Sequence, residues 1–223
     1  MTYLLLIIVT LALGIGAQAG IKAAYRKWSQ VYVSTGLTGA EAARRMLDDN
    51  GLYDVRIDMI AGAVEMTDNY DPTSRTLHLS QGVYSGRTVA ATAIACHEAG
   101  HAVQHAVGYK PLTVRSSIVP VVSFASNIWL ILLIVGIFMN LMGLIWAAVI
   151  LYACVVVFQL VTLPVEFNAS ARALATIKST MPLPAEQYEG CGKVLRAAAF
   201  TYVAAALASL LQLLYFLAMA DRN

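Results

Sequence analysis

The chain has 223 residues, of which 59% are hydrophobic and only 13% are charged, with a formal net charge of +2. A soluble domain of this length needs more polar side chains than this to cover its surface. The composition therefore excludes an ordinary soluble domain, a disordered chain, a nucleic-acid-binding protein and a small disulfide-rich secreted scaffold. It predicts an integral membrane protein.

Four apolar stretches are long enough to cross a bilayer, which takes about 20 residues. None of them contains Asp, Glu, Lys or Arg, and they cover Tyr3–Ala19, Ile118–Met139, Leu141–Leu163 and Ala197–Ala220. Because only Asn140 separates the second stretch from the third, we expect these two to form a tight helical hairpin. The predicted organisation is an N-terminal anchor (1–20), a hydrophilic domain (21–117), a transmembrane hairpin (118–163), a second hydrophilic segment (164–196) and a C-terminal transmembrane helix (197–223).

Basic residues near the predicted spans gather on one side of the membrane. They follow the first span, precede the second and lie between the third and the fourth: Lys22, Arg26, Lys27, Lys110, Arg115, Arg172, Lys178, Lys193 and Arg196. Positive residues near span ends stay in the cytoplasm. We therefore expect a multi-pass protein of the cell membrane with both hydrophilic regions in the cytoplasm and both termini outside.

The N-terminal apolar stretch ends in Ala17-Gln18-Ala19, which is similar to the small-residue cleavage site of a signal peptide. However, no basic residue precedes the stretch, and the basic cluster comes after it. We interpret this segment as a retained membrane anchor.

The first hydrophilic region combines helix and strand patterns. Thr38-Gly39-Ala40-Glu41 is a capping box, which predicts a helix from Ala40 to about Asn50, ended by Gly51. A turn is expected at Asp71–Ser74. Stretches prone to form strands lie at Asp54–Ile60, Ala63–Asn69 and Thr76–Ser80.

Two further helices are expected in the hydrophilic regions. A long one covers about Thr88–Val107 and is ended by Gly108. Another is predicted to begin at Pro164, since proline suits the first turn of a helix, and to be broken by Pro182 and Pro184.

The long helix carries the sequence His97-Glu98-Ala99-Gly100-His101. Two imidazoles four residues apart project from one helical face and can share one Zn²⁺ at about 2.0–2.1 Å. Glu98 can act as general base toward a metal-activated water and then carry the proton to the leaving amine. Without a metal, these side chains would need other polar partners in a helix rich in Ala, Ile and Val. We predict one catalytic zinc ion with His97 and His101 as ligands and Glu98 as the catalytic residue.

A catalytic zinc ion needs a third protein ligand and an open fourth position. His105 continues the histidine spacing by one more turn. It lies about 12 Å from His97 along a straight helix, so the two cannot bind one ion together with His101. We expect His105 beside the site or at the surface.

Glu166 is the third ligand that we predict, because it lies in the second hydrophilic segment on the same predicted side of the membrane. Small residues would let the two helices approach closely, at Gly100, Ala169 and Ala173. The alternative is a solvent-exposed glutamate that stabilises the N-terminus of its helix. Glu186 and Glu189 are weaker candidates, because they follow two prolines in a predicted loop.

Four stretches carry a resemblance to a known family: Tyr70–Pro72, Arg75–Ser80, Ala95–Gln104 and Leu163–Ser170. In these stretches, and over most of its length, the chain resembles the YugP-like family of membrane zinc metallopeptidases. The resemblance implies a zincin-like fold in which His97, His101 and Glu166 bind the metal and Glu98 is the base. The family often has an aspartate where this chain has Asn168. If the family's aspartate orients a ligand histidine, the neutral amide of Asn168 would do so here without the negative charge.

In zincin-like enzymes an extended substrate commonly adds to an edge strand beside the metal-binding helix. Arg75–Ser80 is the candidate strand here. His78 on this strand could contact substrate, and the alternative is an exposed histidine without such a role. A tyrosine, histidine or arginine is expected to stabilise the oxyanion of the tetrahedral intermediate. The chain has eleven tyrosines, and the sequence alone does not single one out.

Together these patterns predict a mainly α integral membrane protein with four transmembrane helices and a small α+β zincin-like soluble domain. Its function would be that of a zinc metalloendopeptidase. Its partners would be a protein or peptide substrate, with membrane proteins among the candidates, and the lipid bilayer, but no nucleic acid. Small-residue faces on the spans would also permit oligomers.

Two alternative functions remain. An intramembrane site-2-type protease would take its third ligand from an Asp in a Leu-Asp-Gly-like motif, and the chain contains no Asp-Gly. A non-catalytic membrane scaffold locked by zinc would need four protein ligands and would leave Glu98 without a role.

Overall fold

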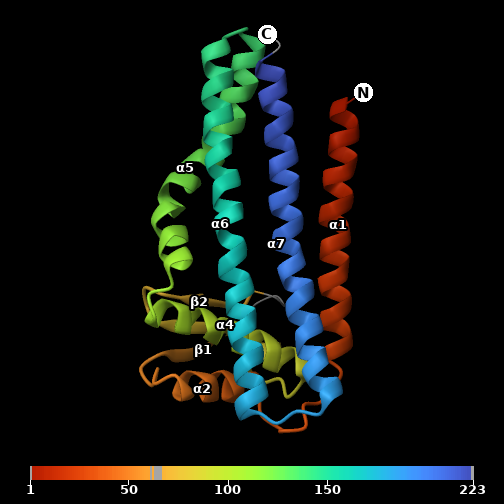
Figure 1. Ribbon diagram of the computed structural model, residues 1–223, viewed down its shortest axis with the longest axis vertical. Coiled ribbons are helices and arrows are strands. Elements are labelled where there is room, and N and C mark those ends of the chain that lie inside the picture. The colour runs from red at the N-terminus through yellow and green to blue at the C-terminus, as the bar shows by residue number, and fades with distance from the viewer. Residues whose placement is uncertain (1, 61, 63–66, 222–223) are drawn as a thin grey trace. The chain divides into compact units, whose positions relative to one another are not determined.

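The computed structural model describes residues 2–60, 62 and 67–221. The chain divides into two compact units. The first, called the helical unit, comprises residues 1–18, 110–164 and 200–223. The second, called the α+β unit, comprises residues 19–109 and 165–199. Three long helices belong partly to one unit and partly to the other (Figure 1).

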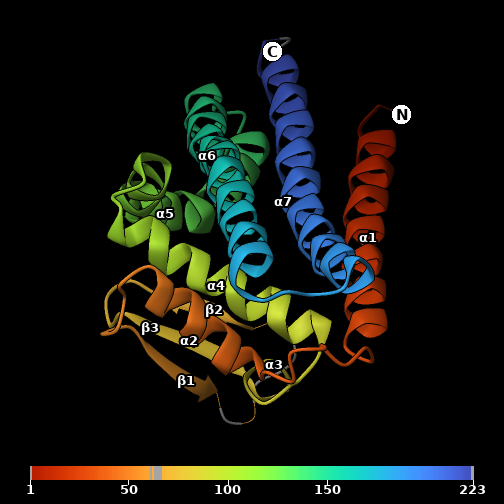
Figure 2. The same cartoon turned by 60° about the horizontal axis from the view of Figure 1, so that its bottom comes forward.

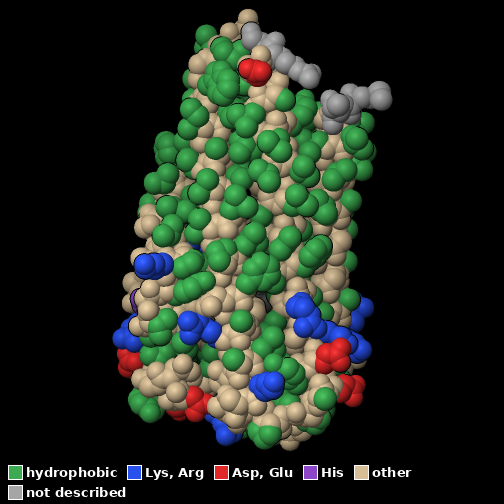
Figure 3. All heavy atoms as spheres, in the orientation of Figure 1, with side chains coloured by type: hydrophobic (Ala, Val, Ile, Leu, Met, Phe, Trp, Pro, Cys, Tyr) green, Lys and Arg blue, Asp and Glu red, His purple; other side chains and the backbone are tan. Residues whose placement is uncertain are grey.

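Among the described residues, four helices are long and apolar enough to cross a membrane, as the sequence predicts. They are α1 (Thr2–Trp28), α5 (Lys110–Phe138), α6 (Met142–Thr180) and α7 (Ala185–Ala220). Hydrophobic side chains cover the visible parts of these helices that belong to the helical unit (Figure 3). Every one of the four extends beyond the apolar stretch from which it was predicted.

A tight turn joins α5 to α6. Asn140 joins α5 to α6 with a φ of 54°, a left-handed conformation that asparagine tolerates better than most residues. The Leu141 amide then donates to the Gly136 carbonyl at 2.8 Å. A Cβ atom on Gly136 would lie 2.9–3.0 Å from atoms of Ile145, so glycine lets the two helices approach closely here.

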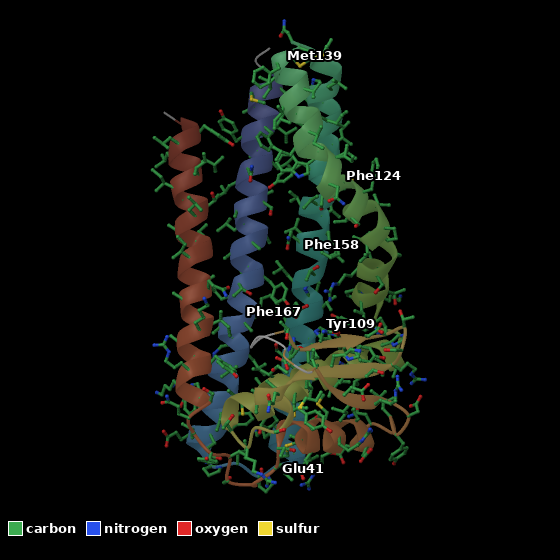
Figure 4. The ribbon with its side chains drawn as sticks, turned by 180° about the vertical axis from the view of Figure 1, so that it is seen from behind. Glu41, Tyr109, Phe124, Met139, Phe158 and Phe167 are labelled. Atoms are coloured by element: carbon green, nitrogen blue, oxygen red, sulfur yellow. The ribbon has the colours of Figure 1, made fainter. Side chains whose placement is uncertain are left out.

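After the C-terminal part of α1, the next helix of the α+β unit is α2 (Gly39–Asp49), which carries the predicted capping box. The Thr38 amide donates to Glu41 Oε2 at 2.7 Å, and the Glu41 amide donates to Thr38 Oγ1 at 3.1 Å (Glu41 in Figure 4). A short α3 (Gln81–Tyr84) precedes α4 (Val89–Ala106), whose N-terminus is capped by Thr88. The long helix expected at Thr88–Val107 is thus confirmed.

The strands found in the described residues form a three-stranded sheet in the α+β unit. Its strands are β1 (Arg56–Ile60), β2 (Asn69–Asp71) and β3 (Thr76–Ser80), and their order is β1-β3-β2. β1 runs parallel to β3, while β2 runs antiparallel to it. α4 packs against α2, β2 and β3 (Figure 2). The strand predicted at Ala63–Asn69 lies mostly outside the described residues.

The prediction that Arg75–Ser80 forms an edge strand is wrong. β3 is the central strand, and the edges are β1 and β2. Leu77 and Leu79 are fully buried, as expected for a strand with a neighbour on each side. The pairing that decides this order joins β3 to residues about twenty positions earlier in the chain, which local patterns do not reveal.

The prediction that a helix begins at Pro164 is also wrong, because α6 continues through this residue to Thr180. A proline inside a helix removes one backbone hydrogen bond, and helices of membrane proteins tolerate this loss. Glu166 therefore lies in the interior of a 39-residue helix. Its alternative interpretation, a solvent-exposed group at a helix N-terminus, is excluded because its side chain is buried.

The second half of α6 reaches the hydrophobic core of the α+β unit. Ala173 and Ile177 of this segment, and Met181 directly after it, are buried in the same cluster as Leu47, Leu77 and Val103. This packing holds the residues that follow Pro164 against α4. It brings together two segments that are about seventy residues apart in sequence.

Candidate metal centre

Three potential metal ligands meet where α4 packs on α6. Glu166 Oε2 lies 3.2 Å from His97 Nε2 and 3.6 Å from His101 Nε2. The ligand atoms of all three residues lie within 4.8 Å of one another. The spacing of four residues puts both histidines on the same face of α4, so the two rings approach the carboxylate from adjacent turns.

Small residues permit this approach, as the sequence predicts. A Cβ atom added to Gly100 would lie 2.7 Å from the carbonyl oxygen of Ala169. Ala169 and Ala173 are both fully buried. The two helix backbones are therefore close enough for the short side chain of Glu166 to reach both imidazoles.

The donor set fits a zinc ion. Four ligands placed tetrahedrally at about 2.0–2.1 Å from Zn²⁺ lie about 3.3 Å from one another. The two measured separations from Glu166 Oε2, 3.2 and 3.6 Å, are close to this value. The Glu166 side chain is only 3% exposed, and each histidine side chain is 13% exposed. The three polar groups are therefore largely shielded from solvent and face one another. Two histidines and one glutamate are also a ligand set of known catalytic zinc sites.

Glu98 is buried beside the three ligands and contributes a second carboxyl group to the site. Burial raises the pKa of Glu98, and the nearby His97 and His101 partly oppose this effect. A carboxyl group whose pKa is raised above its ordinary value is a stronger base and is better suited to accept a proton. Its place directly after His97 is the one expected of a general base.

Opposing effects act on the pKa of His101. Burial lowers the pKa of His101, but its contact with Glu166 and the negative charge of Glu98 outweigh the effect, and the pKa is raised overall. Two acidic groups therefore act on this imidazole, and together they favour a cation in the site. The same field favours a divalent metal ion.

The second nitrogen of each imidazole also has a partner. His97 Nδ1 lies 3.2 Å from Ser170 Oγ, and His101 Nδ1 lies 3.0 Å from Gln104 Oε1. Neither Ser170 nor Gln104 is among the site residues that the sequence predicts. A signal existed, since Gln104 follows His101 by three residues and Ser170 follows Glu166 by four, spacings that make neighbours on a helix.

The remaining predicted residues lie outside the ligand group. His105 Nδ1 lies 2.9 Å from the Tyr70 hydroxyl in an exposed position, which agrees with the expected surface role. Asn168 contacts Gln104 and Arg172. His78 lies half-buried on the central strand, opposite Asp58 on one side and Asn69 on the other.

Two histidines four residues apart, a glutamate after the first and a second glutamate from another helix match the ligand pattern of zinc metallopeptidases. Four helices of the described residues are candidate membrane spans, which is compatible with a membrane-anchored member of this class. The chain belongs to the family described as "putative neutral zinc metallopeptidase", whose profile matches residues 3–221. The resemblance inferred from the sequence is thereby confirmed.

A relative in Bacillus subtilis (strain 168) is described as "Putative membrane protease YugP". It is 48% identical to this chain over 216 residues, which cover 97% of this chain and 95% of that protein. No solved structure matches the chain, so the zincin-like fold stays a prediction.

Proposed function

We propose that the protein is a membrane-anchored zinc endopeptidase that hydrolyses peptide bonds with a single zinc ion. The observation that carries the proposal is the position of Glu166 Oε2, within 3.2 and 3.6 Å of two imidazole nitrogens from α4. His97, His101 and Glu166 would hold the ion. Zinc bound there would polarise the scissile carbonyl and lower the pKa of a water molecule.

Glu98 is the catalytic residue of this proposal. Its carboxylate takes a proton from the attacking water and then delivers it to the nitrogen of the leaving amine. Burial raises the pKa of Glu98, which supports this role, because a stronger base is a better proton acceptor. The family and the Bacillus relative support the class of reaction.

The substrate would be an extended segment of a protein or peptide. β2 is an edge strand and packs against α4, the helix that carries both histidines. A strand edge offers unpaired backbone groups to which an extended peptide can add. We propose β2, in place of the central β3, as the strand beside which the substrate backbone lies.

The active site would face the cytoplasm. Basic residues in the α+β unit support this orientation, among them Lys22, Arg26 and Lys193, which lie near the ends of apolar spans. A cysteine introduced at the exposed Tyr53 of the α+β unit should react with a membrane-impermeant reagent only after the cells are opened. Reaction in intact cells would reverse the orientation.

Neither alternative function is favoured by an observation. For an intramembrane protease, α4 would have to be a transmembrane helix, but it is not among the candidate spans found in the described residues. For a zinc-locked scaffold, four protein ligands are needed, whereas the metal-ligand group found in the described part of the chain has three.

The decisive experiment compares wild type with Glu98→Gln, purified in detergent with zinc, on an unstructured protein substrate. Glu98→Gln should retain its zinc but lose about 100- to 10,000-fold in cleavage rate, the range of a general base. His101→Ala should lose both zinc and activity. Glu186→Gln, which changes an exposed glutamate of α7, is the matched control and should cleave normally. Equal rates for wild type and Glu98→Gln would refute the mechanism.

A further inference from the structure

His101 is held on the side opposite Glu166 by one fully buried amide. Gln104 has no exposed surface, and its Oε1 lies 3.0 Å from His101 Nδ1. Its Nε2 donates to the backbone carbonyl of Val165 at 2.8 Å and to Asn168 Oδ1 at 3.0 Å. Gln104 therefore joins a histidine of α4 to the segment of α6 that carries Glu166.

The direction of these hydrogen bonds is fixed by two groups that have only one possible role, the Arg172 guanidinium and the Val165 carbonyl. Arg172 Nε donates to Asn168 Oδ1 at 2.8 Å, and a guanidinium can only donate. The Val165 carbonyl can only accept. The Gln104 NH₂ group thus faces two acceptors and uses both of its hydrogens, which leaves Oε1 toward the histidine.

An amide oxygen can only accept a hydrogen bond, so His101 Nδ1 must carry a hydrogen and donate it. A neutral imidazole with its hydrogen on Nδ1 has its lone pair on Nε2. Nε2 is the atom that lies 3.6 Å from Glu166 Oε2. The hydrogen bonds that start at Arg172 therefore decide which nitrogen of His101 is free to bind a metal.

We propose that three side chains outside the ligand set, Arg172, Asn168 and Gln104, form a positioning relay. The relay fixes the Nδ1–H tautomer of His101 and presents its Nε2 lone pair to the zinc ion. The metal in this proposal rests on the proposed function. The tautomer itself does not, because it follows from hydrogen bonds of the protein alone.

The other histidine is held differently. The partner of His97 Nδ1 is the hydroxyl of Ser170, at 3.2 Å. A hydroxyl can donate or accept, so Ser170 satisfies either tautomer of His97 and selects neither. Loss of the Ser170 hydroxyl should accordingly affect metal binding much less than loss of the Gln104 amide.

The relay also predicts which side chains can replace Asn168. Its Oδ1 accepts from both Gln104 and Arg172, so an aspartate would serve as well as Asn168. A leucine there would leave both donors without this acceptor. At position 104 a carboxylate would not serve. A glutamate there would place an acceptor oxygen, in place of the NH₂ donor, against two other acceptors, the Val165 carbonyl and Asn168 Oδ1.

The variant Gln104→Glu separates the relay from a simpler interpretation. A carboxylate that accepts from a ligand histidine usually makes the ligand more basic and strengthens metal binding. If contact with His101 were all that mattered, Gln104→Glu would bind zinc at least as tightly as wild type. If the relay operates, the acceptor–acceptor contacts expel the new carboxylate and affinity falls.

The test uses the full-length protein in detergent and two measurements. The first is the tautomer of His101 in the metal-free protein, read by ¹⁵N NMR at alkaline pH, where imidazoles are neutral. The chain has only four histidines, so the signal is assigned by comparison with His101→Asn. The second is zinc affinity by competition with a chelator.

We expect the Nδ1–H tautomer for His101 in wild type and in Asn168→Asp, and a mixture in Gln104→Leu. Zinc affinity should fall about 10- to 100-fold in Gln104→Leu and Gln104→Glu, as for other residues that orient metal ligands. It should fall in Asn168→Leu and be retained in Asn168→Asp. Thr92→Val is the matched control, because Thr92 is a buried polar residue of α4 whose Oγ1 has no hydrogen-bond partner among the described residues.

The proposal is overturned if wild-type His101 carries its hydrogen on Nε2, or if Gln104→Glu binds zinc as tightly as wild type. If Gln104→Leu does not fold, the wild-type tautomer and the two Asn168 variants still decide. A wild type without zinc affinity would refute the metal site of the proposed function, while the NMR measurement would still decide the relay.

Discussion

Gly100 on α4 lies directly against the backbone of Ala169 on α6. A Cβ atom on Gly100 would come within 2.7 Å of the Ala169 carbonyl oxygen and 3.2 Å of its Cα atom. Because these are backbone atoms, no side-chain rotation could relieve the clash. The distance between the two helices, and with it the reach of Glu166 to the histidines, depends on this missing side chain.

Gly100→Ala should therefore push the helices apart and weaken both zinc binding and the fold. We expect a loss of about 1–3 kcal/mol in the free energy of unfolding, the usual cost of inserting a group into a packed interface. Ala169→Gly should not rescue it, since the clash is with backbone. Thermal unfolding and chelator competition measure the two effects.

Gly20→Ala is the control for this variant. Gly20 lies within α1, and apart from the backbone of its own helix no described residue has an atom within 4 Å of an added Cβ. Alanine there should therefore stabilise the helix by up to about 1 kcal/mol. A Gly100→Ala protein that binds zinc and unfolds like wild type would show that the close contact is not required.

The ligands could be predicted from the sequence because each has a local signature. The spacing of His97 and His101 fixes their common face on any helix, and the apolar spans leave few acidic residues as a third ligand. Gln104 and Ser170 lie at helical spacings from His101 and Glu166, but this spacing alone does not show which groups they contact. Their role depends on how α4 is rotated against α6, which the packing of Gly100 on Ala169 determines.

The two errors in the fold have the same origin. A strand such as Thr76–Ser80 has the same pattern of buried leucines at the edge or in the centre of a sheet, and only the pairing with Arg56–Ile60 decides. Pro164 suits a helix start by local preference, yet α6 passes through it. The packing of Ile177 and Met181 in the core of the α+β unit stabilises the continuation of α6.

His105 should not bind the metal, although it continues the histidine spacing of α4. Its Nδ1 is paired with the Tyr70 hydroxyl at 2.9 Å. His105→Ala should keep the zinc affinity of wild type and lose only about 1 kcal/mol of stability from the hydrogen bond. Tyr70→Phe should lose a similar amount of unfolding free energy. The double variant should lose little more than either single variant, because both remove the same hydrogen bond, and a double-mutant cycle measures this. Zinc loss in His105→Ala equal to that in His101→Ala would make it a ligand.

The capping box of α2 should contribute stability that depends on pH. Hydrogen bonds from the Thr38 backbone amide and then from its hydroxyl hold the pKa of Glu41 below its ordinary value of 4.5. A carboxyl group whose pKa is lowered by folding stabilises the protein above its unfolded pKa, and this contribution disappears as the pH falls through the folded pKa.

The difference in unfolding free energy between wild type and Glu41→Gln should thus be constant near neutral pH and shrink below about pH 4.5. Thr38→Ala, which removes the cap's hydroxyl, should reduce the same dependence. Chemical unfolding in detergent between neutral and acidic pH measures it. Parallel curves for wild type and Glu41→Gln over the whole range would contradict the assignment.

Zinc should stabilise the folded protein, and Glu166 should be required for this effect. An ion that binds only the folded state adds about 2.7 kcal/mol at a free concentration 100 times its dissociation constant. Glu166 supplies the anionic ligand from α6, so zinc would tie this helix to α4 through the two histidines. Glu166→Gln removes the charge and should abolish the zinc-dependent rise in melting temperature.

Glu98→Gln should behave differently, because Glu98 is proposed to move protons and not to bind the ion. It should keep the full zinc-dependent rise while losing catalysis. Mg²⁺, which prefers six oxygen ligands, should not replace zinc in wild type. If Glu166→Gln were stabilised by zinc as strongly as wild type, the third ligand would have to be another residue, and the contact of Glu166 with the histidines would be structural only.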